Sequence, residues 1–291
     1  MTISEIDSTT RIGQEGTVKQ ITQYYHNSPE YLTGPLNGTC HFGYTPQGQR
    51  FELRSALHSM EILLGEKLAL PPGSRVLDAG CGFGRVAKTL SSDPFNLDIV
   101  GIDLMSERLR ETFRYSSVHR VSEKVWLING NYCTLPLGDA TVSGVYTMET
   151  LVHADPLEVA LGEFWRVLEP GGWLVLFEYS VPDRASLDPV RKKVTDNMVR
   201  RTGMASIERF THDAFPSLLQ KANFENITVT DISRNVWPTW RWLFWQAIRE
   251  SWPSILRGEF LTNTNLAGSL LIWPYRHFLG YKVVTANKPI Y

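Results

Sequence analysis

The sequence predicts an α/β fold in which helices cover both faces of a mainly parallel sheet. Segment 75–87, RVLDAGCGFGRVA, reads as a short apolar strand, a glycine-rich turn and the start of a helix. From Pro71 to Tyr179 short apolar runs alternate with helical patterns, which is typical of a doubly wound parallel sheet. The chain has 291 residues, 43% of them hydrophobic and 20% charged, the composition of an ordinary globular protein with a sizeable core.

The glycine turn carries a carboxylate two positions before its first glycine. Asp78 is followed by Gly80, Gly82 and Gly84. Glycine lets a backbone approach a ligand where a Cβ atom would block it. A nicotinamide-binding turn has the spacing G-x-G-x-x-G, which holds a pyrophosphate, whereas this turn has G-x-G-x-G. The extra carboxylate suits a ligand that carries an ammonium group, and it therefore indicates S-adenosylmethionine.

This segment resembles the first motif, D-x-G-x-G-x-G, of the class I S-adenosylmethionine-dependent methyltransferases. The resemblance implies a Rossmann-like, doubly wound sheet of seven strands whose last two strands form a partly antiparallel edge. It also implies S-adenosylmethionine as the cofactor and S-adenosylhomocysteine as its product. We expect the turn to hold that cofactor through Asp78, Gly80, Cys81, Gly82 and Gly84.

Segments after the next two predicted strands supply further cofactor contacts. Asp103 ends the second strand, where a carboxylate can accept hydrogen bonds from both ribose hydroxyls, and Leu104 can cover the adenine. Residues 130–136, GNYCTLP, resemble the family segment G-D-x-x-x-L-P, with Asn131 in place of the Asp that binds the adenine amino group. The Asn131 carbonyl can still accept that bond, and Tyr132 can stack on the ring or pack as a core aromatic. The expected cofactor set also includes Tyr24, Thr147 and His153.

The chain after the fourth predicted strand resembles the sterol and terpenoid branch of this family. Residues 148–156, METLVHADP, correspond to the branch segment E-A-x-x-H-A, and 166–172 to the common R-V-L-x-P-G-G, a helix stop and turn. One helical turn can place Glu149 and His153 above the transferred methyl group, although a helix cap and a structural polar contact are the alternatives. Upstream, YY at 24–25 and CHFGY at 40–44 resemble segments that close over the cofactor. The candidate catalytic residues are His153, Glu149, Tyr25 and His41.

The pattern of elements divides the chain into three regions. We expect an N-terminal helical lid over 1–70, the cofactor-binding core over 71–180, and a substrate cap with the final strands over 181–291. The first region has predicted helices over 17–25 and 51–64 and a long loop over 27–43. The core has strands near 76–77, 97–102, 125–129, 144–148 and 173–179, with helices over 106–115 and 156–168. The last region has a helix over 212–222, strands over 226–231 and 282–286, and an insertion over 233–281 between them.

Aromatic residues crowd the insertion, where six of the nine tryptophans follow residue 235. Trp237, Trp240 and Phe244 recur at near-helical spacing and, with Tyr179, are the candidate substrate-binding residues, because aromatic faces stabilise a developing cation. The alternative is a helix packed on the sheet or in an interface between subunits of a homo-oligomer. Peripheral membrane contact is a third interpretation, supported by two neighbouring cations, Arg241 and Arg249.

These patterns predict a methyltransferase of natural-product biosynthesis that acts on a lipophilic small molecule, a terpenoid or prenylated compound. We expect methylation of an alkene carbon through a carbocation, which proton loss or cyclisation would quench. One alternative is O- or N-methylation of an aromatic natural product, with His41, His153 or His277 as the base. Another is a non-catalytic module that binds S-adenosylmethionine.

Composition and motifs disfavour several other classes. A net charge of −1 gives no footprint for nucleic acid, and the chain has no Y-x-x-x-K pair of the kind expected in a nicotinamide-dependent oxidoreductase. Three cysteines without C-x-x-C spacing predict neither a disulfide framework nor a metal site. No apolar stretch reaches the roughly 18 residues of a membrane span, and the N-terminus lacks an apolar signal core. We therefore expect a cytoplasmic protein.

Overall fold

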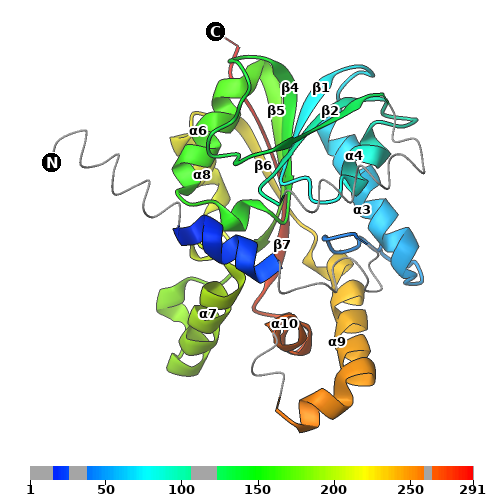
Figure 1. The fold of residues 1–291 in the computed structure, drawn as a ribbon, viewed down its shortest axis with the longest axis vertical. Coiled ribbons are helices and arrows are strands. Elements are labelled where there is room, and N and C mark those ends of the chain that lie inside the picture. Colours follow the sequence, from blue (N-terminus) through cyan, green and yellow to red (C-terminus); the bar gives the residue numbers. More distant parts are fainter. Residues whose placement is uncertain (1–15, 26–37, 106–122, 259–263, 291) are drawn as a thin grey trace, which may run out of the picture.

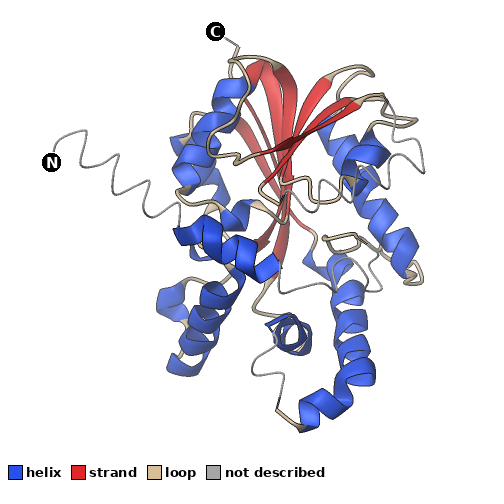
Figure 2. Ribbon diagram, viewed as in Figure 1, coloured by secondary structure: helices blue, strands red, loops and turns tan. Residues whose placement is uncertain are grey.

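Among the described residues, 16–25, 38–105, 123–258 and 264–290, seven strands form a single sheet in a computed structural model of the chain (Figures 1 and 2). Their order across the sheet is β3-β2-β1-β4-β5-β7-β6. The strands are β1 (Arg75–Ala79), β2 (Asp98–Asp103), β3 (Val125–Asn129), β4 (Val142–Met148), β5 (Leu168–Ser180), β6 (Glu225–Asp231) and β7 (Gly280–Asn287).

The sheet is parallel except for one strand. β1 pairs in parallel with β2 and β4, and β3 and β5 extend this parallel part on either side. β7 lies between β5 and β6 and is antiparallel to both. The predicted seven-stranded sheet with a partly antiparallel edge is therefore confirmed. Strand order reverses between β1 and β4, and ligands of such sheets bind beside that reversal, at the carboxyl ends of the strands.

Helices cover both faces of the sheet, and each face has its own apolar core (Figure 1). On one face α6 (Leu157–Val167) and α8 (Phe215–Lys221) contribute Phe164 and Phe215. On the other face α3 (Leu53–Leu68), α4 (Arg85–Leu90) and the start of α9 (Ser233–Leu256) contribute side chains such as Met60 and Trp240. This arrangement confirms the doubly wound architecture.

The start of β5 is where the observed strand differs most from the prediction. We expected a helix stop and a turn over 169–172, followed by a strand from Trp173. The helix does stop, because α6 ends at Val167. The strand, however, begins directly at Leu168, and its pairing with β4 is irregular between Val142 and Gly144. Gly171 has φ of 80°, so the expected turn is accommodated as an irregularity within the strand.

Other predicted elements lie within a few residues of the observed ones. The N-terminal helix spans 16–25, and α3 begins at Leu53, where Glu52 accepts hydrogen bonds from two backbone N–H groups of the first turn. Of the loop predicted over 27–43, residues 38–43 form neither helix nor strand. Residues 26–37 and the helix predicted over 106–115 lie outside the described residues.

The insertion between β6 and β7 consists of α9 and α10 (Thr264–Ile272). α10 packs against α9 and against α7 (Pro189–Thr202), the helix that follows β5. These three helices form one end of the molecule, beyond the sheet (Figure 1). None of the described helices is both long enough and apolar enough to cross a bilayer. The division into lid, core and cap stays a prediction.

Candidate active site

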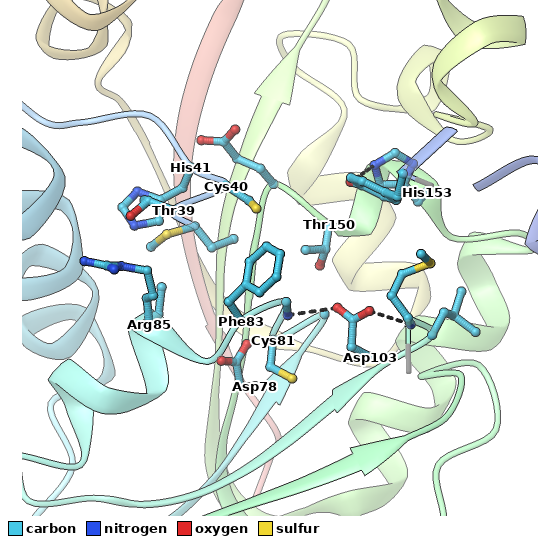
Figure 3. A pocket seen from close by; sticks show the side chains of 18 of the residues that line it. Thr39, Cys40, His41, Asp78, Cys81, Phe83, Arg85, Asp103, Thr150 and His153 are labelled. Atoms are coloured by element: carbon cyan, nitrogen blue, oxygen red, sulfur yellow. Dashed lines mark hydrogen bonds between the residues drawn. The ribbon is translucent and has the colours of Figure 1, made fainter. Parts of the chain in front are cut away.

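A cavity opens at the carboxyl ends of β1, β2 and β4, beside the reversal of strand order (Figure 3). It encloses about 860 Å³ of empty space when its solvent-open mouth is included. Its walls come from the N-terminal helix, residues 38–41, the glycine turn and the turn after β4. The predicted site residues that line it are Tyr25, His41, Asp78, Gly80, Cys81, Gly82, Asp103, Leu104, Tyr132, Glu149 and His153.

The glycine turn needs its glycines for both backbone conformation and space. Gly80, Gly82 and Gly84 have φ of 92°, 52° and 67°, a region that residues with a side chain rarely adopt. A Cβ atom on Gly80 would lie 2.6 Å from the Thr150 side chain. Gly84 lies at the start of α4 and does not line the cavity. The turn therefore brings bare backbone to the cavity wall.

Asp103 holds the turn in place from the end of β2. Its Oδ2 accepts a hydrogen bond of 2.8 Å from the Gly82 N–H, and its Oδ1 accepts one of 2.8 Å from the Met105 N–H (Figure 3). Each carboxylate oxygen can accept a second hydrogen bond. The side chain therefore joins the glycine turn to the chain after β2 and still has acceptor capacity toward the cavity.

Asp78 is a buried carboxyl at the end of β1. It is 4% exposed, and its Oδ2 is buried without a close hydrogen bond among the described residues, with the Tyr146 hydroxyl of β4 as its neighbouring polar group. Burial raises the pKa of Asp78 to about 7, the Tyr146 hydroxyl opposes that shift, and the charge of Asp103 adds to it. A buried carboxyl at a cavity wall without a cation beside it calls for an explanation, and a cationic ligand group provides one.

Glu149 begins the turn after β4 and accepts three hydrogen bonds. Its Oε1 accepts from the Phe42 N–H and the Tyr281 hydroxyl, each at 2.7 Å, and its Oε2 accepts from the Tyr179 hydroxyl. Burial raises the pKa of Glu149, although these donors oppose the shift. Its φ is 60°, an unusual conformation for a residue with a long side chain. The carboxyl group is fixed between the chain at Phe42 and two strands of the sheet.

A second buried carboxyl, Glu178 of β5, supports the same turn. Its Oε1 accepts hydrogen bonds from the Thr150 N–H at 3.0 Å, the Leu151 N–H at 2.7 Å and the Thr147 hydroxyl at 3.2 Å. Burial raises the pKa of Glu178 to about 8. No motif in the sequence pointed to Glu178 as a site residue. The available signal was a single acidic residue inside the apolar run 173–179, WLVLFEY.

His153 is oriented by one hydrogen bond and faces the N-terminal helix with its other nitrogen. Its Nδ1 lies 3.0 Å from the Gly203 carbonyl oxygen, which can only accept, so we assign the proton of the neutral ring to Nδ1. Nε2 is then an acceptor and lies 3.2 Å from the Tyr25 hydroxyl. On the same helix, the Thr17 hydroxyl donates to Asp155 Oδ2 at 2.5 Å. The structure thus brings Tyr25 and His153 together.

His41 lines the cavity but has no nitrogen available as a base. Its Nδ1 lies 2.8 Å from the Phe42 carbonyl oxygen and its Nε2 lies 3.4 Å from Glu61 Oε1. Burial alone would lower the pKa of His41, but Glu61 outweighs it and raises that pKa above the usual value. Two acceptors favour the doubly protonated ring. The geometry therefore supports a buried ion pair at this position rather than a proton acceptor.

Besides Gly84, three predicted cofactor residues lie outside the cavity wall. Asn131 Oδ1 accepts a hydrogen bond of 2.8 Å from the Cys133 N–H, which occupies the carbonyl that we expected to bind adenine. Thr147 is fully buried, and its hydroxyl donates to Glu178. Tyr24 is buried and its ring packs against Tyr25, 4.9 Å between centroids. Conversely, the cavity is lined by residues that the analysis did not single out, including Thr39, Phe83, Arg85 and Thr150.

The predicted substrate-binding aromatics do not share one surface. Trp240 is fully buried in the core, with its ring centroid 5.8 Å from that of Phe42. Trp237 lines a separate groove with His277, and their ring centroids are 5.1 Å apart. Phe244 lies two turns further along α9, and Tyr179 donates to Glu149. The interpretation of this stripe as a packed helix is thus correct for Trp240, and none of the four lines the cavity.

The comparisons with known proteins agree with this architecture. Residues 77–176 match the model of a methyltransferase domain family. The S-adenosyl-L-methionine-dependent Diels-Alderase iccD of Talaromyces variabilis is 32% identical over 241 residues, which cover 79% of this chain and 82% of that protein. The sterol 24-C-methyltransferase erg6 of Schizosaccharomyces pombe is 27% identical over 83% of this chain and 62% of its own length. The crystal structure of the [4+2]-cyclase SpnF has a TM-score of 0.73 and 21% identity and covers 97% of this chain and 96% of its own.

The residues of the cavity fit S-adenosylmethionine. The buried carboxyl of Asp78 suits its ammonium group, Asp103 has acceptor capacity for ribose hydroxyls, and the glycine turn presents backbone without side chains to the cavity. Among the described residues no group of three or more His, Cys, Asp and Glu side chains is placed to hold a metal ion. The fold, the cavity and the relatives together show that the chain belongs to the class I S-adenosylmethionine-dependent methyltransferases, related to the sterol and terpenoid branch, with S-adenosylmethionine as its cofactor.

Proposed function

We propose that this enzyme methylates an alkene carbon of a lipophilic terpenoid or prenylated small molecule. The observation that carries the proposal is the turn after β4. It places a buried carboxyl, Glu149, and a neutral imidazole, His153, on the wall of the cavity that also contains the glycine turn. A phenol acceptor would need a general base beside it. Of the three histidines considered for that role, His41 is held in an ion pair with Glu61 and His277 lines a separate groove, so only His153 remains.

The chain's task in such a reaction is alignment and tolerance of positive charge. When bound, S-adenosylmethionine supplies an electrophilic methyl group, which forms the new carbon–carbon bond as its sulfur–carbon bond breaks. Asp78, Asp103 and the glycine turn fix the donor, and this alignment lowers the barrier to an in-line displacement. Attack by an alkene leaves a carbocation on the acceptor. The buried Glu149 carboxyl and nearby aromatic rings are suited to stabilise it.

Proton loss would complete the reaction. The Tyr25 hydroxyl takes the proton adjacent to the cation and passes its own to His153 Nε2, the acceptor nitrogen of the assigned tautomer. The product alkene then carries one methyl group more and one hydrogen less than the acceptor. Because a carbocation is a strong acid, a weak base is sufficient for this step.

Turnover with methyl-labelled cofactor tests the proposal. Purified protein is incubated with a panel of prenylated and terpenoid alkenes and, separately, with phenols and amines, and products are assigned by mass spectrometry and NMR. We expect label on carbon only, and a loss of at least tenfold in kcat for His153→Ala. The proposal fails if products carry the label on oxygen or nitrogen alone.

A second candidate is a [4+2] cyclisation, favoured by the 32% identity to a protein named as a Diels-Alderase. In that reaction the cofactor would remain bound without being consumed. Replacing S-adenosylmethionine by S-adenosylhomocysteine separates the two functions, because methyl transfer then stops whereas cyclisation of a polyene substrate continues.

A further inference from the structure

The outward face of the second half of α9 is unusual for a helix that packs on a sheet. Arg241, Trp245, Arg249, Trp252 and Leu256 recur every three or four residues and are all exposed, so they form one stripe, which we call the α9 stripe. The two tryptophans are 59% and 58% exposed and Leu256 is 76% exposed. The solvent face of such a helix is normally polar. Here large apolar side chains alternate with arginines.

The helices beside the stripe extend both its apolar and its cationic character. α10 packs against α9 and is followed by a short segment, and in this region Leu271 and Phe278 are exposed. α7, which packs on the other side of α10, has five Lys and Arg residues and one Asp. The guanidinium of Arg191 from α7 lies 4.0 Å above the Phe278 ring. The chain as a whole has a net charge of −1, so the helix α7 and the α9 stripe are richer in cations than the rest of the sequence.

We propose that the α9 stripe, with α10 and α7, docks on the surface of an anionic lipid membrane. Tryptophan is enriched at the membrane–water interface because its ring is apolar and its N–H is polar. Arginines beside it pair with lipid phosphates and are attracted by the negative surface potential. This pattern lies along an exposed helix, so docking needs no spanning segment.

Charge favours a lipid surface over a second copy of the chain as the occupant. A two-fold interface would place the stripe against itself, because the same patch is used on both subunits. Its arginines would then face like charges in a desolvated contact, which is destabilising. An anionic membrane instead neutralises them while it takes up Trp245, Trp252 and Leu256.

Vesicle co-sedimentation of the full chain tests the proposal. The probes are vesicles of phosphatidylcholine alone and of phosphatidylcholine with one quarter phosphatidylglycerol. We expect binding to the anionic vesicles that weakens as salt is raised. The double variant Trp245→Ala/Trp252→Ala should bind them at least tenfold more weakly, and Arg241→Gln/Arg249→Gln about tenfold or more, since each cation near an anionic surface contributes about fivefold.

Trp126→Ala is the matched control. Trp126 is 49% exposed, but it lies on β3, at the opposite edge of the sheet from β6 and the insertion that follows it. This variant should bind vesicles as the wild type does. The arginine variant changes only exposed side chains and provides the test if the tryptophan variant does not fold.

Three results would overturn the proposal: no binding to anionic vesicles, equal binding by the stripe variants, or binding that is independent of salt and lipid charge. A fourth contradicting result would come from sedimentation velocity: the wild type is a dimer, the stripe variants are monomers, and the wild type does not bind vesicles. Vesicle binding is measured without an acceptor and without turnover. The test of membrane docking is therefore independent of the test of carbon methylation, and either proposal can be wrong while the other is right.

Discussion

The glycine-turn side of the cavity and the α9–α10 end of the molecule are built by different kinds of constraint. At the turn, positive φ at three glycines and two backbone N–H groups bonded to Asp103 determine the shape. Along α9, the shape is an ordinary helix, and function depends on which face each side chain occupies. Trp240 is 0% exposed and Trp252 is 58% exposed, although both are tryptophans of the same helix. A residue that is needed for its backbone conformation has few possible roles, whereas the role of an aromatic side chain depends on the helix face that it occupies.

The largest expected effect sharpens this contrast within α9. Trp240→Ala removes a fully buried indole that packs against Phe42, so we expect the free energy of unfolding to fall by about 4 kcal/mol. Trp252→Ala removes an exposed indole and should change it by less than about 0.5 kcal/mol. Urea denaturation followed by circular dichroism measures both. A similar fall in the free energy of unfolding for the two variants would contradict the contrast between a buried Trp240 and an exposed Trp252.

On the turn side, Asp103→Ala should abolish most of the cofactor affinity. The substitution removes two charge-assisted hydrogen bonds that hold Gly82 and Met105, together with the expected ribose contact. At about 1.5–3 kcal/mol for each of the two expected bonds from the ribose hydroxyls to the carboxylate, we expect at least a hundredfold weaker binding of S-adenosylhomocysteine by calorimetry. Asp98→Ala, at the other end of β2, is the control and should bind normally. A change of less than threefold in Asp103→Ala would contradict the assignment.

Local signals in the sequence predicted the turn side well. Asp78, Gly80, Gly82 and Asp103 all lie on the cavity wall, because strand, turn and strand end follow one another within a single α/β unit. The alternation of elements likewise predicted the sheet, and a long insertion did not disturb it because α9 and α10 leave and return at the β6–β7 edge.

Contacts between distant segments could not be predicted in this way. Glu149 is held by Phe42, Tyr179 and Tyr281, which lie far from it in the sequence. His41 appeared as a candidate base because the Glu61 carboxylate that occupies it comes from α3. Asn131 was assigned by its alignment to a family motif, whereas its own turn satisfies its carbonyl. In each case the residue type suggested a role, but the sequence did not predict the hydrogen-bond partner that the residue has in the fold.

A pH series sharpens the role of Asp78. Burial raises its pKa to about 7, against about 4 in the unfolded chain. The protonated form therefore stabilises the cofactor-free protein fully below about pH 4, and this contribution is lost as the pH rises through 7. Cofactor binding needs the carboxylate, so affinity should rise about tenfold between pH 6 and 7.5 while stability falls.

Asp78→Asn separates these two trends from other titrating groups, among them Glu178. Relative to the wild type, the variant should lose both the fall in unfolding free energy between pH 5 and 7 and the rise in cofactor affinity. Denaturation and calorimetry at each pH provide the two measurements. If the variant retains the wild-type pH dependence of affinity, the ammonium contact belongs to another group.

The smallest effect concerns the contact between the N-terminal helix and the turn after β4. Tyr25→Phe removes the hydroxyl that would take the proton from the carbocation, and because His153 Nε2 remains to accept that proton directly, we expect kcat to fall only about fivefold with little change in cofactor affinity. Thr22→Ala, whose hydroxyl donates to Val18 on the exposed face of the same helix, should leave kcat unchanged. Steady-state kinetics at saturating cofactor measures both. A fall in cofactor affinity with constant kcat would instead place Tyr25 on the donor side of the cavity, and the N-terminal helix would then belong with the glycine turn and not with the acceptor.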